Sequence, residues 1–172
     1  MALRFTLDPE LTPELREQLV SLWTDVSNAG GAVGFVAPVS RADVALEAER
    51  HYAALSGGRA RMVAGFDGDR LAASTFLTFN THRLMRHWAW LYTVMVDPSL
   101  QGRGNGAELL QAAERSARDL GLEGLKLTCR GGMGLERFYA SAGYKEVGRV
   151  PAAIRVAAGD DRDDITMWLP LT

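Results

Sequence analysis

A glycine-rich segment between a predicted strand and a predicted helix is the part of the sequence best suited to chemistry. Residues 101–106 read QGRGNG and follow an apolar run that ends at Asp97. The first N–H groups of a helix have no partner within the helix, and the helix dipole leaves that end partly positive. Glycine has no Cβ to keep an anion away from such groups. The segment therefore predicts a backbone cradle for phosphate oxygens, to which Arg103 adds a charge-assisted contact.

Two nucleotide-binding patterns and a plain flexible turn fit this segment less well. A P-loop ends in Gly-Lys-Ser/Thr, whereas Gly104-Asn105-Gly106 contains no lysine. A dinucleotide-binding fingerprint is spaced G-x-G-x-x-G, whereas these glycines are spaced G-x-G-x-G. A turn that needs only flexibility rarely gathers several glycines, since each costs about 0.5–1 kcal/mol of backbone entropy inside a regular element. An anion-binding role is therefore favoured.

The hydrophobic periods along the chain give the order of the elements that position this segment. Strands are expected at residues 3–7, 61–66, 70–79, 87–97, 124–129, 144–150 and 165–169, and helices at 12–26, 40–55, 104–120 and 135–142. This order predicts the α/β class, with a mixed sheet flanked by helices. A length of 172 residues suits a single domain, residues 1–172.

Local signals support several of these boundaries. Thr12 supplies a capping hydroxyl before Pro13, and Glu14 lies near the positive end of the helix dipole. Ser40 is a second candidate cap. Asp67-Gly68-Asp69 separates two strand-like runs and predicts a tight hairpin turn.

The glycine-rich segment and a later aromatic segment together resemble a known family. Met95-Val96-Asp97-Pro98 followed by Gln101-x-x-Gly104-x-Gly106 resembles the Q/R-x-x-G-x-G/A signature of the GNAT superfamily of N-acetyltransferases. Residues 135–144, LERFYASAGY, are similar to the family segment A-x-x-F/L-Y-x-x-x-G-F. The element order resembles the GNAT fold over essentially the whole chain, which implies a mostly antiparallel sheet of about seven strands with four helices. Residues 30–35 and 147–151 are similar to loops of tabtoxin-resistance acetyltransferases that help to wall the acceptor pocket.

This resemblance implies acetyl-coenzyme A (acetyl-CoA) as the cofactor. The backbone of Val94 and Val96 is expected to pair with the pantetheine arm in the manner of an added strand. The N–H groups of residues 102–107 are expected to hold the pyrophosphate. The candidate cofactor-binding residues are Val94, Met95, Val96, Gln101, Gly102, Arg103, Gly104, Asn105, Gly106, Ala107 and Phe138.

The resemblance also implies the chemical step. Tyr139 is the candidate catalytic residue, as general acid for the departing thiolate, because a phenol with an ordinary pKa near 10 suits that transfer. Without the resemblance, Tyr139 beside Phe138 is more typical of a packed aromatic. A backbone N–H of Val94 or Met95 is expected to stabilise the oxyanion.

Three positions depart from the family pattern, so the resemblance names no general base. Trp90 stands where many members have a glutamate, and Thr128 stands where tabtoxin-type enzymes have an acid. Gly132 replaces an asparagine that is common seven residues before the tyrosine. Trp90 is expected in the core, with an aromatic wall for the acceptor as the alternative. Ordered water is the alternative to a side-chain base.

Composition excludes several classes of protein. A formal net charge of −2 argues against a polyanion-binding protein, so no nucleic-acid partner is expected. The longest apolar run, residues 88–96, is too short to cross a membrane, and residues 1–8 do not resemble a secretion signal. Cys129 is the only cysteine, which excludes an internal disulfide. A cytoplasmic protein is expected.

The remaining polar groups give weaker signals. His51, His82 and His87 have no metal-ligand spacing, so we expect surface or strand positions and no metal. Cys129 is expected to be a buried apolar thiol rather than a nucleophile. Asp160, Asp161, Asp163 and Asp164 are expected in a solvated acidic loop between the last two strands, with attraction of a cationic amine as the alternative.

The sequence therefore predicts an acetyl-CoA-dependent N-acetyltransferase that acts by direct attack of a primary amine. The acceptor is expected to be a small molecule, such as an antibiotic, toxin or metabolite, and a homodimer is in keeping with the family. The alternative is a non-catalytic acyl-CoA-binding sensor or interaction module on the same fold. A nucleotide-binding domain is the third hypothesis.

Overall fold

The computed structural model describes residues 2–172 and contains the helices and strands in the predicted order. Two short 3-10 turns flank β4. The elements are β1 (Arg4–Leu7), α1 (Pro13–Asn28), α2 (Arg41–Ser56), β2 (Ala60–Asp67), β3 (Arg70–Phe79), β4 (Trp88–Val96), α3 (Asn105–Asp119), β5 (Gly124–Arg130), α4 (Leu135–Ser141), β6 (Lys145–Ala157) and β7 (Asp160–Pro170).

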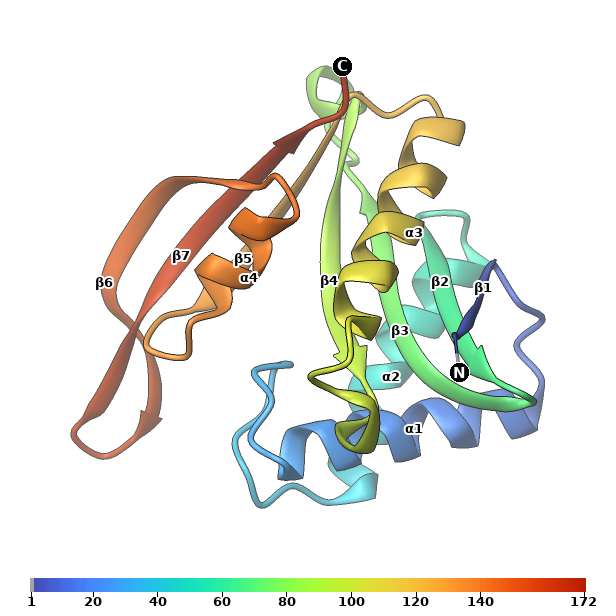
Figure 1. Ribbon diagram of the computed structural model, residues 1–172, viewed down its shortest axis with the longest axis horizontal. Coiled ribbons are helices and arrows are strands. Elements are labelled where there is room, and N and C mark those ends of the chain that lie inside the picture. The colour runs from blue at the N-terminus through green and yellow to red at the C-terminus, as the bar shows by residue number, and fades with distance from the viewer. Residues whose placement is uncertain (1) are drawn as a thin grey trace.

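The strands form one seven-stranded sheet in the order β1-β2-β3-β4-β5-β7-β6 (Figure 1). Every neighbouring pair is antiparallel except β4 and β5, which are parallel and are connected through α3. The mixed, mostly antiparallel sheet with four helices agrees with the predicted fold class.

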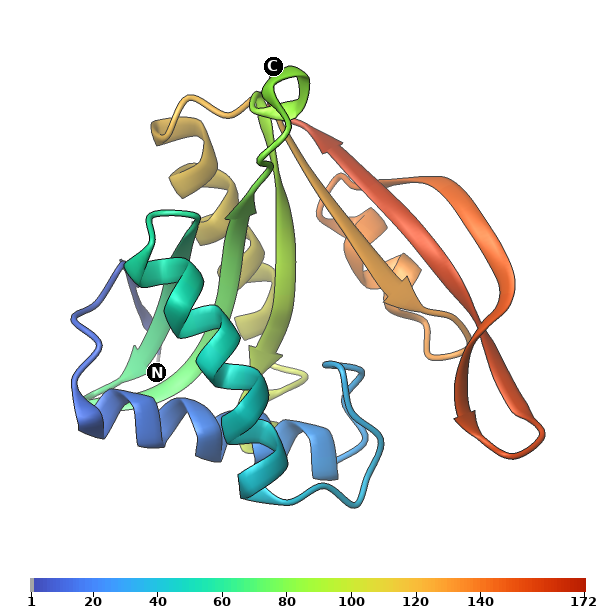
Figure 2. The same cartoon turned by 180° about the vertical axis from the view of Figure 1, so that it is seen from behind.

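Helices cover both faces of the sheet and give it two apolar cores. Helices α1 and α2 lie together across β2, β3 and β4, whereas α3 crosses the opposite face and α4 lies beside β5 and β7 (Figures 1 and 2). Leu19 and Trp23 of α1 belong to the first core, and Leu109 and Leu110 of α3 belong to the second. Because helices cover both faces, residues 71–77 of β3 are all buried, including the polar Ser74 and Thr75.

The sheet splits between its two central strands. β4 pairs with β5 only at Trp88, Ala89 and Trp90, after which the strands diverge in a V (Figure 1). β4 is also irregular here: its register with β3 shifts, and Thr93 adopts a φ of +58°. The Thr75 hydroxyl donates a 2.8 Å hydrogen bond to the Tyr92 carbonyl beside the bulge. The split therefore leaves the second half of β4 unpaired on the β5 side.

Local signals in the sequence give the expected ends of the helices. The Leu15 N–H donates to the Thr12 hydroxyl at 3.1 Å, and the Asp43 N–H donates to the Ser40 hydroxyl at 3.1 Å. The turn at Gly68 has a φ of +61° and joins β2 to β3, as predicted. None of the helices among residues 2–172 is long and apolar enough to span a membrane.

The last two strands correct one prediction. The acidic segment is not a loop, because Asp160, Asp161, Asp163 and Asp164 all lie in β7. β6 and β7 form a long hairpin that projects from the body, with Arg155 paired to Asp161 and Arg149 to Asp163 (Figure 1). Most of β6 is exposed, and buried residues alternate only in the second half of β7, at Ile165, Met167 and Leu169. The outer part of the hairpin therefore has no apolar alternation by which the sequence could have predicted it.

Candidate active site

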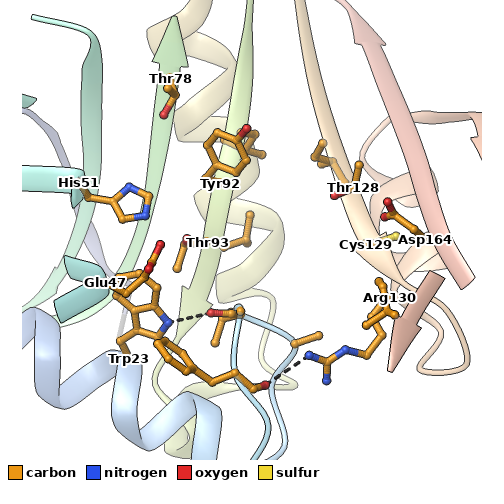
Figure 3. Close-up of a pocket in the computed structure, with 18 of the residues that line it drawn as sticks. Trp23, Glu47, His51, Thr78, Tyr92, Thr93, Thr128, Cys129, Arg130 and Asp164 are labelled. Atoms are coloured by element: carbon orange, nitrogen blue, oxygen red, sulfur yellow. Dashed lines mark hydrogen bonds between the residues drawn. The ribbon is translucent and has the colours of Figure 1, made fainter. Parts of the chain in front are cut away.

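A cavity of about 750 Å³ lies where β4 and β5 separate (Figure 3). It is lined by α2, by the loop that follows α1, by the diverging halves of β4 and β5, and by Tyr139 of α4. His51 and Glu47 come from one wall, whereas Thr128, Cys129, Arg130 and Asp164 come from the other. The split in the sheet therefore creates the main site.

The predicted phosphate cradle has the geometry of an anion site. Gly102 and Gly104 adopt φ values of +73° and +86°, a backbone conformation that favours glycine. α3 begins at Asn105, and the Glu108 N–H makes the first helical hydrogen bond, to the Gly104 carbonyl at 3.1 Å. The amides of the residues between them precede that bond, so helix geometry gives them no helical acceptor. The exposed glycine backbone fits a phosphate group.

The polar side chains of the cradle hold the loop together. The Gln101 amide donates to the Val96 carbonyl at 3.0 Å, and the Asn105 amide donates to the Leu100 carbonyl at 2.9 Å. Asn105 is buried, whereas Arg103 is exposed. Residues 101–104, which include Arg103, are exposed, so this part of the cradle faces solvent.

Phe138 joins the cradle to α4. A Cβ added at Gly106 would lie 3.0 Å from the Phe138 ring, so a larger residue would crowd that ring. The Phe138 and Tyr139 rings lie 5.1 Å apart. Two of the candidate residues, Gly106 and Phe138, are therefore in close approach, and Ala107 follows at the exposed start of α3.

The candidate residues of β4 have different environments. Val94 is half-buried and lines the cavity. The Met95 side chain is fully buried in the core with α1 and α2. Val96 packs on the opposite side of the sheet, and its carbonyl accepts the Gln101 amide. Val94 is thus the candidate whose side chain borders the site.

Tyr139 of α4 borders the cavity between β4 and β5. Its side chain is buried and lines the cavity, and its ring meets that of Tyr144 edge-on at 5.7 Å. Burial raises the pKa of its hydroxyl well above the ordinary value. Tyr139 therefore keeps its proton at neutral pH.

The sequence patterns did not single out Glu47 or predict the position of His51. The two residues lie one turn apart on α2 and both line the cavity, so the expectation of a surface or strand position for His51 is wrong. The His51 ring stacks on Phe76 at 4.3 Å and meets Trp23 edge-on at 5.5 Å. Burial lowers the pKa of His51, and the Glu47 carboxylate partly opposes that shift.

The sequence does contain a weak indication of where His51 lies. Val44, Ala48 and Tyr52 mark the buried stripe of α2, and Glu47 and His51 lie beside that stripe with the i,i+4 spacing of one helix face. Sequence alone does not show that the neighbouring stripe borders a cavity, because the cavity depends on where β4 and β5 part.

Trp90 is not the expected core residue. It is only half-buried, its ring stacks on Tyr92 at 5.7 Å, and the Lys126 ammonium lies 4.7 Å above it. Trp90 occurs at the last paired position of β4, where the sheet begins to open. It therefore lies outside the residues that line the cavity.

The two β5 positions singled out by sequence both reach the cavity. Thr128 is exposed there and provides no acid. Cys129 is buried, as expected, and burial raises its thiol pKa to about 11. A thiol that stays protonated is a poor nucleophile.

Two hydrogen bonds hold the loop that closes the cavity floor. The Trp23 indole donates to the Val33 carbonyl at 2.8 Å, and the Arg130 Nη2 donates to the Phe35 carbonyl at 3.2 Å (Figure 3). One bond ties the loop to α1 and the other ties it to β5. The loop thereby bridges the two sides of the split.

Comparison with solved structures finds this fold in several bacterial proteins. A ribosomal-protein-alanine N-acetyltransferase from Brucella melitensis is 16% identical, with a TM-score of 0.77 and 99% of each chain covered. A Bacillus subtilis acetyltransferase in complex with CoA is 18% identical, with a TM-score of 0.67 and 99% of each chain covered. A Salmonella typhimurium protein solved with its cofactor acetyl-CoA is 15% identical, with a TM-score of 0.77 and 100% of this chain and 95% of that chain covered.

These identities are low, so the solved structures support the fold alone. The sequence itself carries the family assignment, since residues 15–144 match the acetyltransferase (GNAT) family. That match includes most of α1, the glycine cradle and Tyr139. The chain therefore belongs to the acetyltransferase (GNAT) family and is an acetyltransferase.

Proposed function

We propose that the protein transfers an acetyl group from acetyl-CoA to the primary amine of a small molecule. One observation carries this proposal: a single cavity joins Val94 and Tyr139 in the split to His51 and Glu47 on α2. The group that protonates a leaving thiolate and a group that can accept an amine proton thus border the same space. Its volume of about 750 Å³ suits a small ligand.

Binding of the cofactor is assigned to the cradle and the adjoining half of β4. The amides of residues 102–107 bind the pyrophosphate, and the Arg103 guanidinium adds a charged contact. The backbone of Val94 and Val96 pairs with the pantetheine arm, and a backbone N–H of Val94 or Met95 stabilises the developing oxyanion. Acetyl-CoA supplies the acetyl group as a thioester.

His51 accepts the proton of the attacking amine. Its lowered pKa keeps the imidazole neutral at physiological pH, and a neutral imidazole is a base. The adjacent Glu47 carboxylate stabilises the imidazolium once it forms. Among the groups that line the cavity, His51 thus replaces the acid that the family pattern places at Trp90.

Two residues, His51 and Tyr139, carry the proton transfers of the reaction. The amine nitrogen forms the new N–C bond as the C–S bond breaks. His51 takes one proton from the nitrogen, and the Tyr139 hydroxyl gives one to the sulfur. Exchange with solvent returns both side chains to neutral, so the products are the amide and the free thiol.

A thiol-release assay over a panel of primary amines tests this function. Release that depends on both acetyl-CoA and an amine, and falls in His51→Gln, supports the proposal. Binding of acetyl-CoA without release on any amine instead supports the sensor hypothesis. In a thermal-shift assay, coenzyme A is expected to raise the melting temperature more than ATP does, which opposes a nucleotide-binding domain.

A further inference from the structure

Two charged side chains of opposite sign line the cavity without ion-pair partners. Within residues 2–172, Glu47 pairs with Arg50 at 3.6 Å and Arg155 pairs with Asp161 at 2.7 Å. Arg130 and Asp164 have no such pair in the same part of the chain. These two are therefore the uncompensated charges of the cavity.

Their separation is unexpected from their positions in the sheet. Arg130 of β5 and Asp164 of β7 are direct cross-strand partners, and opposite charges in such positions ordinarily attract. Instead, Arg130 points toward the cavity floor, where its Nη2 donates to Phe35, while Asp164 lies nearer Thr128 and Cys129 (Figure 3). Each side chain thus presents its charge at a different part of the same wall.

Arg130 also has unused hydrogen-bonding capacity. Of the five N–H groups of its guanidinium, the one on Nη2 that contacts Phe35 is engaged. Its Nε is buried and has no hydrogen-bond partner among the described residues. Burial and the nearby Arg162 both lower the pKa of Arg130, because each disfavours the positive charge. Arg162 itself is neutralised by Asp160 at 3.1 Å.

We infer that the acceptor of the proposed acetyl transfer is an amino-acid-like molecule whose carboxylate binds Arg130. A guanidinium binds a carboxylate with charge-assisted hydrogen bonds, and such a partner offsets the burial of Arg130. Asp164 supplies the opposite charge and attracts the ammonium form of the same molecule. This inference rests on the proposed function, because it names the substrate class of that cavity.

The test uses L-α-amino acids, each paired with its own carboxamide, which keeps the amine and removes the carboxylate. In Arg130→Gln, kcat/KM is expected to fall about tenfold or more for the acids relative to their amides, since a charged hydrogen bond is lost. Comparing each ratio with that of the unmodified protein cancels the different basicities of the two amines. An equal change for acids and amides overturns the inference.

Two matched variants separate the charge of Arg130 from its structural role. Trp23→Phe removes the other hydrogen bond of the floor loop and leaves Arg130 in place, so it is expected to affect acids and amides alike. Arg155→Gln removes an exposed arginine of the same cavity that is already paired with Asp161. A selective loss of acids in either control variant overturns the assignment to Arg130.

A second variant tests the opposite charge. Asp164→Asn is expected to raise KM several-fold for both members of every pair, because both carry the amine. Replacing an acid by its amide then tests the carboxylate end of the ligand, whereas Asp164→Asn tests the amine end. A change in Asp164→Asn that is confined to the acids contradicts the inference.

Direct binding keeps the inference testable if no amine is acetylated. The amino acids are then titrated into the CoA-saturated protein by calorimetry. Tighter binding of acids than of amides, lost in Arg130→Gln with unchanged coenzyme A affinity, supports the carboxylate site even where the proposed function fails. Equal binding of acids and amides, or an equal loss of coenzyme A affinity, rejects it.

Discussion

The glycine cradle and the cavity between β4 and β5 are constructed in different ways. The cradle, which is the main part of the proposed cofactor side, is one continuous segment, residues 101–107, that leads into the start of α3. The cavity, which is the proposed acceptor side, gathers side chains from distant segments, including His51 of α2, Arg130 of β5 and Asp164 of β7. One side is therefore a local backbone structure, whereas the other depends on tertiary packing.

This difference predicts which mutations affect coenzyme A binding and which affect turnover of the amine. Backbone amides are present whatever the side chains are, so the cofactor side is altered chiefly by changes that distort the loop. The acceptor side depends on individual side chains and is altered by single polar substitutions. Coenzyme A affinity and amine turnover should therefore respond to different sets of variants.

The largest effect is expected for His51→Gln. Glutamine can still form hydrogen bonds but cannot accept the amine proton, so kcat should fall by about 10²–10³. Coenzyme A affinity should stay within about twofold, because His51 lies on the acceptor side. Steady-state kinetics and calorimetry on the same samples measure the two quantities. His87→Gln, an exposed histidine just before β4, is the matched control.

The pH dependence of the same variant sharpens this prediction. For the unmodified protein, kcat/KM calculated for the neutral form of the amine should rise with pH. Since burial lowers the pKa of His51, this kcat/KM should level off above a pKa that lies below the ordinary histidine value of 6.5. Below that pKa the imidazole is protonated and cannot accept a proton. His51→Gln should lack this acid limb. If the limb persists unchanged, another group is the base.

A smaller effect is expected for Tyr139→Phe, about tenfold to a hundredfold in kcat. Burial raises the pKa of Tyr139, which keeps the proton in place but also makes it a weaker acid toward the sulfur. Acyl donors with more acidic thiols should rescue the variant, since they need less protonation on leaving. Tyr144→Phe, whose hydroxyl is also buried, serves as the control for a purely structural loss. Failure of such donors to narrow the gap between Tyr139→Phe and the unmodified protein argues against general acid catalysis.

On the cofactor side, Gly104→Val should weaken coenzyme A binding about tenfold. A β-branched residue at a φ of +86° costs about 1–3 kcal/mol, so the loop must leave the conformation that presents its amides. Turnover at saturating acetyl-CoA should change much less. Gly148→Val is the control, because a Cβ there meets no atom within 4 Å and its φ is not positive. Unchanged coenzyme A affinity in Gly104→Val would remove the cradle from the cofactor site.

The same contrast explains what could be predicted from sequence. The cradle was predicted because its glycines, its preceding strand and its amphipathic helix are contiguous, and backbone conformation follows from local residue types. Tyr139 was proposed only through a resemblance, since a tyrosine beside a phenylalanine is otherwise more typical of packing. His51 and Arg130 were not proposed from the sequence, because their places at the cavity depend on the three-residue pairing of β4 with β5 and the divergence beyond it. The β6–β7 hairpin was predicted too short because its outer part, beyond the buried Ile165, has cross-strand ion pairs rather than apolar alternation.

The smallest effect is expected for Trp23→Phe, which lies where the acceptor side meets the core. Phenylalanine preserves the ring packed on His51 and Phe35 but removes the donor to the Val33 carbonyl. A buried carbonyl without its donor costs about 1–3 kcal/mol of folding free energy, measurable by urea denaturation. KM for the amine should rise only a few-fold, because Arg130 still holds the loop at Phe35, and coenzyme A affinity should not change. A change in coenzyme A affinity of the same size would mean that the proposed cofactor and acceptor sides are coupled through this loop.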